Sequence, residues 1–140
     1  MPRLTRKPLT TTRSTSKSFR SGLEERIAQD LIEAGIYFAY EDRVIHYTKP
    51  EKVARYTPDF ELDNGIIIEA KGRFLTQDRQ KHLLVKAQHP EHDIRFVFSR
   101  SKERISKKSK TTYADWCTRH GFLFADEKIP DEWFEEPKHV

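Results

Sequence analysis

Two acidic residues and a lysine stand close together around a short turn of the sequence. Asp59 follows Pro58, and after nine intervening residues Glu69-Ala70-Lys71 ends a run of apolar residues. Carboxylates that face each other across two strands repel, and a hard divalent cation removes that repulsion. A cation bound through oxygen atoms is typically Mg²⁺ or Mn²⁺, and it can polarise a phosphodiester and lower the pKa of its bound water. A lysine beside it could orient that water and stabilise developing negative charge, so the pattern predicts phosphodiester hydrolysis.

Whether these side chains meet depends on the turn between the two predicted strands. Side chains alternate between the faces of a strand, so Glu69 and Lys71 point the same way. A three-residue loop at 63–65, with its glycine in the left-handed conformation, places Asp59 opposite Glu69 on that face. A two-residue loop would instead place Asp59 opposite Ala70 and turn it to the other face. We expect the three-residue loop.

A helix is predicted to begin before these strands, at Ser21. Ser21 followed three residues later by Glu24 is a capping-box pattern, and apolar residues then recur at helical spacing as far as Gly35. A capping glutamate needs no metal. The pattern alone therefore leaves Glu24 open to either role, helix cap or metal ligand.

The remaining patterns predict an α/β fold with a mixed central β-sheet flanked by helices. Segments are expected in this order: extended at 36–47, strand at 56–62, strand at 66–71, helix at 77–88, strand at 94–98 and helix at 113–120. Aromatic and aliphatic residues at 122–134 are expected to pack onto the core. The three consecutive isoleucines suggest a strand that is buried on both faces.

Length and composition limit the class of protein. The chain has 140 residues, enough for one domain with a real core. No apolar run approaches the roughly 20 residues that a membrane helix needs. The single cysteine excludes an intramolecular disulfide, which fits a reducing compartment, so we expect a cytoplasmic protein.

Positive charge is concentrated in two segments, the N-terminal 20 residues and the stretch at 100–110. The net charge is +4, but residues 1–20 alone carry six basic residues and no acid. We expect residues 1–18 to be a basic, unfolded tail and residues 19–140 to form a single domain. Both basic segments are predicted to contact DNA phosphates, although a solvated tail, a transit peptide or an ordinary surface loop are the alternatives. The predicted DNA-binding residues are Arg3, Arg6, Lys7, Arg13, Lys17, Arg20, Arg100, Lys102, Arg104, Lys107, Lys108 and Lys110.

Several blocks of the sequence resemble one family of nucleases. Pro58-Asp59 with Glu69-Ala70-Lys71 resembles the PD-(D/E)xK nuclease signature. Blocks in the same order over residues 19–137 resemble endonuclease I of T-seven-type bacteriophages. They are Phe19-Arg20-Ser21-Gly22-Leu23-Glu24, Tyr56-Thr57-Pro58-Asp59-Phe60, Asn64-Gly65-Ile66, Lys81-His82-Leu83-Leu84, Gln88-His89-Pro90-Glu91, Asp93-Ile94-Arg95, Val97-Phe98-Ser99, Phe124-Ala125-Asp126 and Ile129-Pro130.

The resemblance implies a restriction-endonuclease-like core and a particular active site. Glu24, Asp59, Glu69 and Lys71 would be catalytic. Asp59, Glu69 and the Ala70 carbonyl would bind one Mg²⁺ or Mn²⁺, and Glu24 would share a second with Asp59. The resemblance also implies a homodimer that exchanges segments through the stretch at 47–53, so that Glu24 enters each site from the partner chain.

The implied activity is cleavage of branched DNA. Members of the family hydrolyse phosphodiesters in four-way (Holliday) junctions, in DNA recombination within the host bacterial cytoplasm. Two alternatives remain at this stage. One is a DNA-binding protein that keeps the fold without the reaction, and the other is a restriction-like or transposon-end nuclease.

Overall fold

The computed structural model describes residues 19–49 and 52–138. The predicted basic tail at 1–18, with Arg3, Arg6, Lys7, Arg13 and Lys17, lies outside the described residues. Within the described ranges no helix is long and apolar enough to cross a membrane.

A mixed sheet of five strands forms the centre of the molecule, as the sequence predicts. Along the sheet, the first three strands pair antiparallel with one another, and the fourth and fifth strands are added in parallel. The spatial order is β1 (Phe38–Tyr40), β4 (Phe60–Leu62), β5 (Ile67–Lys71), β6 (Ile94–Phe98) and β7 (Phe124–Asp126).

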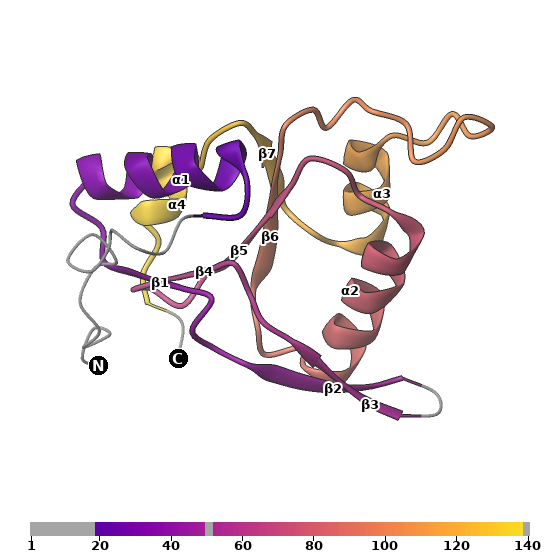
Figure 1. Ribbon diagram of the computed structural model, residues 1–140, viewed down its shortest axis with the longest axis horizontal. Helices are drawn as coiled ribbons and strands as arrows, with labels where there is room; N and C mark the ends of the chain where they lie inside the picture. Colours follow the sequence, from indigo (N-terminus) through magenta and orange to yellow (C-terminus); the bar gives the residue numbers. More distant parts are fainter. Residues whose placement is uncertain (1–18, 50–51, 139–140) are drawn as a thin grey trace.

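Helices cover the two faces of this sheet (Figure 1). On one side lie α1 (Gly22–Glu33) and the short α4 (Asp131–Phe134), whose apolar residues share a cluster with β1 and β4. On the other side lie α2 (Thr76–Gln88) and α3 (Tyr113–His120), which pack on a second cluster rich in aromatic rings. The predicted helices are therefore confirmed.

A separate two-stranded hairpin extends along the α2 side of the molecule (Figure 1). It consists of β2 (Ile45–Lys49) and β3 (Lys52–Tyr56), which pair antiparallel within the one chain. The end of α2 holds this hairpin, because the Gln88 side chain accepts from Thr48 N–H at 2.6 Å and donates to Thr48 C=O at 2.7 Å. The predicted extended segment at 36–47 is thus divided between two sheets.

The central strands are buried on both faces. Ile66, Ile67 and Ile68 are at most 1% exposed, which confirms the prediction from the isoleucine run. Every residue of β6 is buried, including Arg95, which pairs with Asp93 and Glu136. The buried charge of Arg95 is tolerated because these two carboxylates form ion pairs with it.

The C-terminal segment adds to the sheet as well as to the core. Ile129 and Trp133 are buried, as expected. β7 was not predicted as a strand, because three residues that are at least partly exposed give no periodic signal. Its parallel pairing with β6 is set by tertiary contacts.

Candidate active site

A three-residue loop joins β4 to β5. Leu62 N–H donates to Ile66 C=O at 2.8 Å, and Gly65 N–H donates to Leu62 C=O at 3.0 Å. Gly65 has φ +97°, a region that glycine enters without steric cost. Asn64 fixes the loop further, because its side-chain oxygen accepts from Ile66 N–H at 3.1 Å. The predicted loop is therefore confirmed.

The register of this hairpin brings Asp59 to Glu69. Phe60 pairs with Ile68, so the next pair outward is Asp59 with Glu69. Both side chains are buried, at 6% and 4% exposure. Asp59 is held in place by main chain, since its Oδ2 accepts from Ala70 N–H at 2.9 Å.

Lys71 lies on the same side of β5 as Glu69, as strand alternation predicts. Its Nζ is 3.8 Å from Glu69 Oε2 and 3.3 Å from Asp78 Oδ1. Asp78 also accepts from Leu75 N–H at 3.0 Å, so it closes the first turn of α2. The lysine ammonium is thus fixed between the Glu69 carboxylate and the start of α2. Asp78 was not among the residues predicted from the sequence.

Glu69 is also held by a tyrosine from the hairpin. Tyr56, the last residue of β3, donates its hydroxyl to Glu69 Oε1 at 2.7 Å. The phenol is fully buried, and burial raises the pKa of Tyr56 well above its usual value. It therefore acts as a fixed donor. Lys81 lies over the Tyr56 ring, 5.5 Å from its centroid.

Glu24 enters the site from α1. Ser21 caps the helix, because its hydroxyl accepts from Glu24 N–H at 3.1 Å. The Glu24 carboxylate points elsewhere: Oε1 accepts from the Tyr40 hydroxyl at 2.6 Å and from Arg20 N–H at 3.0 Å. The two roles left open by the sequence are therefore compatible, since the backbone of Glu24 takes part in the cap and its side chain reaches the site.

A further carboxylate at the site, Glu41, was not predicted from the sequence. It follows β1, and its N–H donates to Asp59 C=O at 3.0 Å. Its φ is +48°, a left-handed conformation that costs a non-glycine residue about 1–2 kcal/mol. Among the residues that the structure describes, the buried Glu41 Oε2 has no hydrogen-bond partner, and Arg20 Nη1 lies 3.5 Å away. Its proximity to the site depends on the β1–β4 pairing, which no local pattern reveals.

Three carboxylates form a group that could hold a metal ion. Glu24, Glu41 and Asp59 each offer an oxygen, and these atoms lie within 4.8 Å of one another. Burial raises the pKa of Asp59, and the charges of Glu69 and Glu24 raise it further. Burial also raises the pKa of Glu69, against the opposing charge of Lys71. Such a set of crowded oxygen ligands fits a hard divalent cation of the Mg²⁺ or Mn²⁺ kind.

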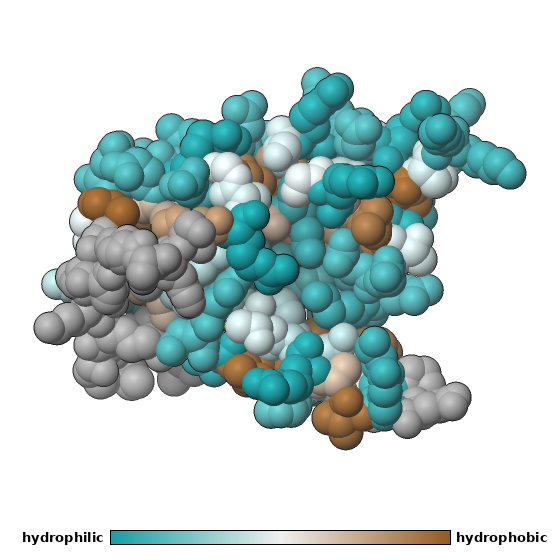
Figure 2. Space-filling view, in the orientation of Figure 1, coloured by the Kyte–Doolittle hydropathy of each residue, from teal (hydrophilic) through white to brown (hydrophobic). Residues whose placement is uncertain are grey.

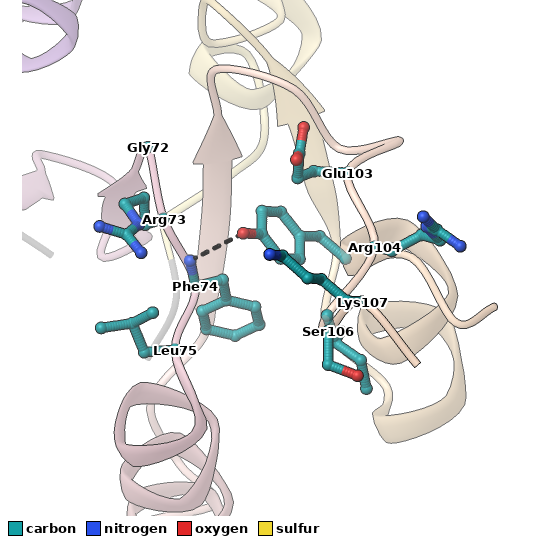
Figure 3. Close-up of a pocket in the computed structure, with 10 residues that line it drawn as sticks. Gly72, Arg73, Phe74, Leu75, Glu103, Arg104, Ser106 and Lys107 are labelled. Atoms are coloured by element: carbon teal, nitrogen blue, oxygen red, sulfur yellow. Dashed lines mark hydrogen bonds between the residues drawn. The ribbon is translucent and has the colours of Figure 1, made fainter. Parts of the chain in front are cut away.

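A basic groove begins directly beyond Lys71. A cavity of about 470 Å³ opens between the segment after β5 and the loop at 100–110. Lys107 extends toward Arg73 across it, whereas the Arg104 guanidinium points outward (Figure 3). Lys107 and Arg104 belong to the predicted DNA-binding set, and Arg73 was missed. Phe74 N–H donates to the Tyr113 hydroxyl at 3.2 Å and closes the floor of the groove.

The other described basic residues of the predicted set lie on the surface. The loop at 100–110 leaves the body of the molecule as an irregular segment, and hydrophilic side chains cover most of the visible face (Figures 1 and 2). Arg20 differs from them, because it lies beside Glu41 at the carboxylate group. The exposed members of the loop are Arg100, Lys102, Arg104, Lys107 and Lys108, and Lys110 is exposed at its end.

The fold and the site define an α/β protein with a carboxylate–lysine centre, and known proteins with similar sequences show its family. The family model for phage endonuclease I matches residues 7–140. Endonuclease I of Escherichia phage T7 is 50% identical over 121 residues, which cover 86% of this chain and 81% of that protein. Endodeoxyribonuclease 1 of Enterobacteria phage T3 is 52% identical over 122 residues, or 87% and 80%. The chain belongs to the phage endonuclease I family.

Proposed function

We propose that this protein is a divalent-metal-dependent DNA endonuclease that resolves four-way junctions and other branched DNA. The observation that carries the proposal is the position of Asp59, between Glu69 on β5 and the Glu24–Glu41 pair. The phage T7 relative is named an endonuclease and the phage T3 relative an endodeoxyribonuclease, which supports the same reaction here. DNA cleavage would take place in the cytoplasm of the host bacterial cell.

Each residue of the centre would have a distinct role. Asp59 and Glu69, with the Ala70 carbonyl, would hold one cation, and Glu24 would share a second with Asp59. When bound, such cations polarise the scissile phosphate and lower the pKa of the attacking water. Lys71, fixed by Asp78, would orient that water and stabilise negative charge that develops on the phosphate.

The shape of the basic surface would select the substrate. Arg73 and Lys107 line a groove that starts at the active site, and phosphate contacts of this kind position DNA without reading its sequence. In a branched substrate, the DNA backbone leaves the branch point in more than one direction. The exposed loop at 100–110 would contact the phosphates of a second DNA arm.

A homodimer would supply the two cuts that a junction needs. A two-fold dimer has two equivalent sites, one for each strand to be cut. In the single chain, Glu24 and Asp59 meet within one molecule. Exchange of segments through the stretch at 47–53 would preserve the same contacts between two identical chains, with Glu24 from the partner, on a restriction-endonuclease-like core.

The proposal is tested with an immobile four-way junction and a linear duplex of the same sequence. With Mg²⁺, the protein should cut the junction on two strands and leave the duplex largely intact. Glu69→Ala or a chelator should abolish cleavage but not junction binding. Binding without any cleavage by the unaltered protein would support the non-catalytic alternative, and equal cleavage of both substrates would support a restriction-like nuclease.

A further inference from the structure

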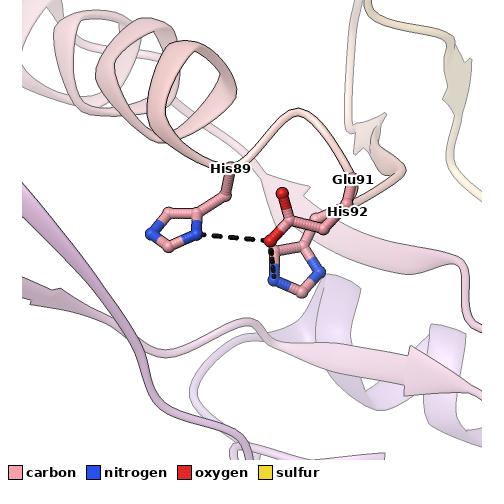
Figure 4. A group of neighbouring side chains, drawn as sticks. All are labelled: His89, Glu91 and His92. Carbon is pink, nitrogen blue, oxygen red and sulfur yellow. Dashed lines mark hydrogen bonds and ion pairs between the residues drawn. The ribbon is translucent and has the colours of Figure 1, made fainter.

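A second group of metal-ligand side chains lies away from the active site, in the turn between α2 and β6. His89 is the C-cap residue directly after α2, and Glu91 and His92 follow it (Figure 4). One ligand atom from each residue lies within 4.8 Å of the others. His89 Nδ1 is 3.4 Å from Glu91 Oε2, and His92 Nε2 is 3.6 Å from that same oxygen.

These separations are close to those between the ligands of a tetrahedral metal ion. Bonds of roughly 2.0–2.1 Å to nitrogen and oxygen at tetrahedral angles place neighbouring ligand atoms about 3.3 Å apart. Both distances to Glu91 Oε2 are close to that value. The two histidine nitrogens lie within 4.8 Å of each other, so side-chain rotation would bring all three atoms onto one ion.

A hydrogen bond to the main chain decides which nitrogen of His89 faces the group. His89 Nε2 lies 2.6 Å from the His46 carbonyl oxygen on β2. A carbonyl can only accept, so Nε2 carries the proton. A neutral imidazole then presents its lone pair at Nδ1 toward the Glu91 carboxylate. Metal-binding histidines are commonly oriented by such a carbonyl bond from the other ring nitrogen.

This arrangement leaves two electron-rich atoms, His89 Nδ1 and Glu91 Oε2, facing each other at 3.4 Å. Two such atoms repel each other, so a positive charge on one of them or between them is needed to make their approach favourable. A second proton on His89 would supply it, and so would a cation shared by all three side chains. The third side chain, His92, has its Nε2 3.6 Å from the same oxygen, so one cation could contact all three side chains.

We propose that His89, Glu91 and His92 bind a transition-metal ion of the zinc class, with water in the fourth position. Two imidazoles and one carboxylate suit Zn²⁺, Co²⁺ or Ni²⁺ rather than Mg²⁺. The site joins the turn after α2 to β2 through His89 and His46, beside the Gln88–Thr48 hydrogen bonds. A bound ion therefore fixes the β2–β3 hairpin to the body of the protein. This role is independent of the proposed nuclease reaction.

The test uses the untagged full-length chain carrying Asp59→Asn, so that the active-site group loses its central carboxylate. Zn²⁺ is titrated by calorimetry, and Co²⁺ is followed by its visible absorption, which reports imidazole ligands in tetrahedral geometry. We expect one equivalent per chain and at least a tenfold weaker affinity in both His92→Leu and His92→Gln. Hydrogen exchange at 45–49 should slow when Zn²⁺ is added.

The matched control is His46→Ala, which removes a nearby imidazole and leaves the carbonyl that binds His89. It should bind Zn²⁺ as tightly as the parent chain. Unchanged affinity in the His92 variants, or no stoichiometric Zn²⁺ uptake by the parent, would overturn the proposal and indicate that a proton holds the group together. Equal loss in His46→Ala would place the ion elsewhere and overturn it as well.

Discussion

The hydroxyl of Tyr56 donates a 2.7 Å hydrogen bond to Oε1 of Glu69, and both side chains are buried. A hydrogen bond to a charged group contributes roughly 1.5–3 kcal/mol, and an unsatisfied buried carboxylate costs more. Since Tyr56 ends β3 and Glu69 lies on β5, this contact ties the two-stranded hairpin to the central sheet.

Tyr56→Phe should therefore weaken cleavage through the position of Glu69. We expect single-turnover cleavage of a junction to fall about tenfold, in line with the loss of one charge-assisted hydrogen bond. The Mg²⁺ concentration for half-maximal rate should rise. Tyr47→Phe is the matched control, because Tyr47 is a buried tyrosine of the same hairpin whose hydroxyl makes no hydrogen bond within the described part of the chain. Equal effects of the two substitutions would contradict a specific role for Tyr56.

Asp59→Asn should stabilise the metal-free protein, and increasingly so as pH rises. Burial first, and then the charges of Glu69 and Glu24, raise the pKa of Asp59 above its ordinary 3.8. At pH values between the unfolded-state pKa of Asp59 and its higher folded-state pKa, the folded state binds more protons than the unfolded state. The free energy of unfolding therefore falls by up to about 1.4 kcal/mol for each unit by which the pH rises. The asparagine side chain does not titrate, and it keeps an oxygen that can accept from Ala70 N–H.

Urea unfolding with a chelator, at a series of pH values, measures this difference. The gap between Asp59→Asn and the parent should widen from pH 4 toward neutrality, while Mg²⁺ should stabilise the parent alone. Identical pH slopes for the two proteins would mean that Asp59 is not crowded by its neighbours.

Glu41→Gln should weaken cation binding without unfolding the protein. Glutamine keeps the shape of the side chain but replaces one of three carboxyl groups, whose oxygens lie within 4.8 Å of one another, by an uncharged amide. We expect about a tenfold rise in the Mg²⁺ requirement of cleavage, comparable with the loss of an outer metal contact. Calorimetric titration with Ca²⁺ gives a readout that does not depend on turnover. Glu25→Gln, on the exposed side of α1, should change neither quantity.

Removal of the two cations across the basic groove should reduce the salt dependence of DNA binding. In the double variant Arg73→Ala, Lys107→Ala, the slope of log affinity against log salt should decrease by about 2, roughly one for each lost phosphate contact. Lys128→Ala, near α1, is the control and should leave the slope unchanged. A slope that stays the same in the double variant would show that DNA follows another path.

The part of the site that local chemistry determines was predictable from the sequence. The loop at 63–65 follows from a glycine that tolerates φ +97°, and it sets the Asp59–Glu69 register. The side shared by Glu69 and Lys71 follows from strand alternation alone. These features need no knowledge of distant contacts.

The rest depends on tertiary packing. Glu24 meets Asp59 only because α1 packs across the sheet, and Glu41 arrives through the β1–β4 pairing. The capping pattern suggested a role for Glu24 without revealing where its carboxylate points. Family resemblance supplied that assignment, but it did not supply Glu41 or Asp78.

Three carboxylates of the site are held by donors of the protein itself. Tyr40 holds Glu24 at 2.6 Å, Tyr56 holds Glu69 at 2.7 Å, and main chain holds Asp59. These side chains are therefore already ordered when the protein folds. They lose little conformational entropy when a cation binds. Burial and the charges of Glu69 and Glu24 raise the pKa of Asp59 to about 9, so a cation that enters near neutral pH takes the place of a proton on that carboxyl. Rapid capture of cations, with almost no rearrangement of the backbone, is the expected consequence.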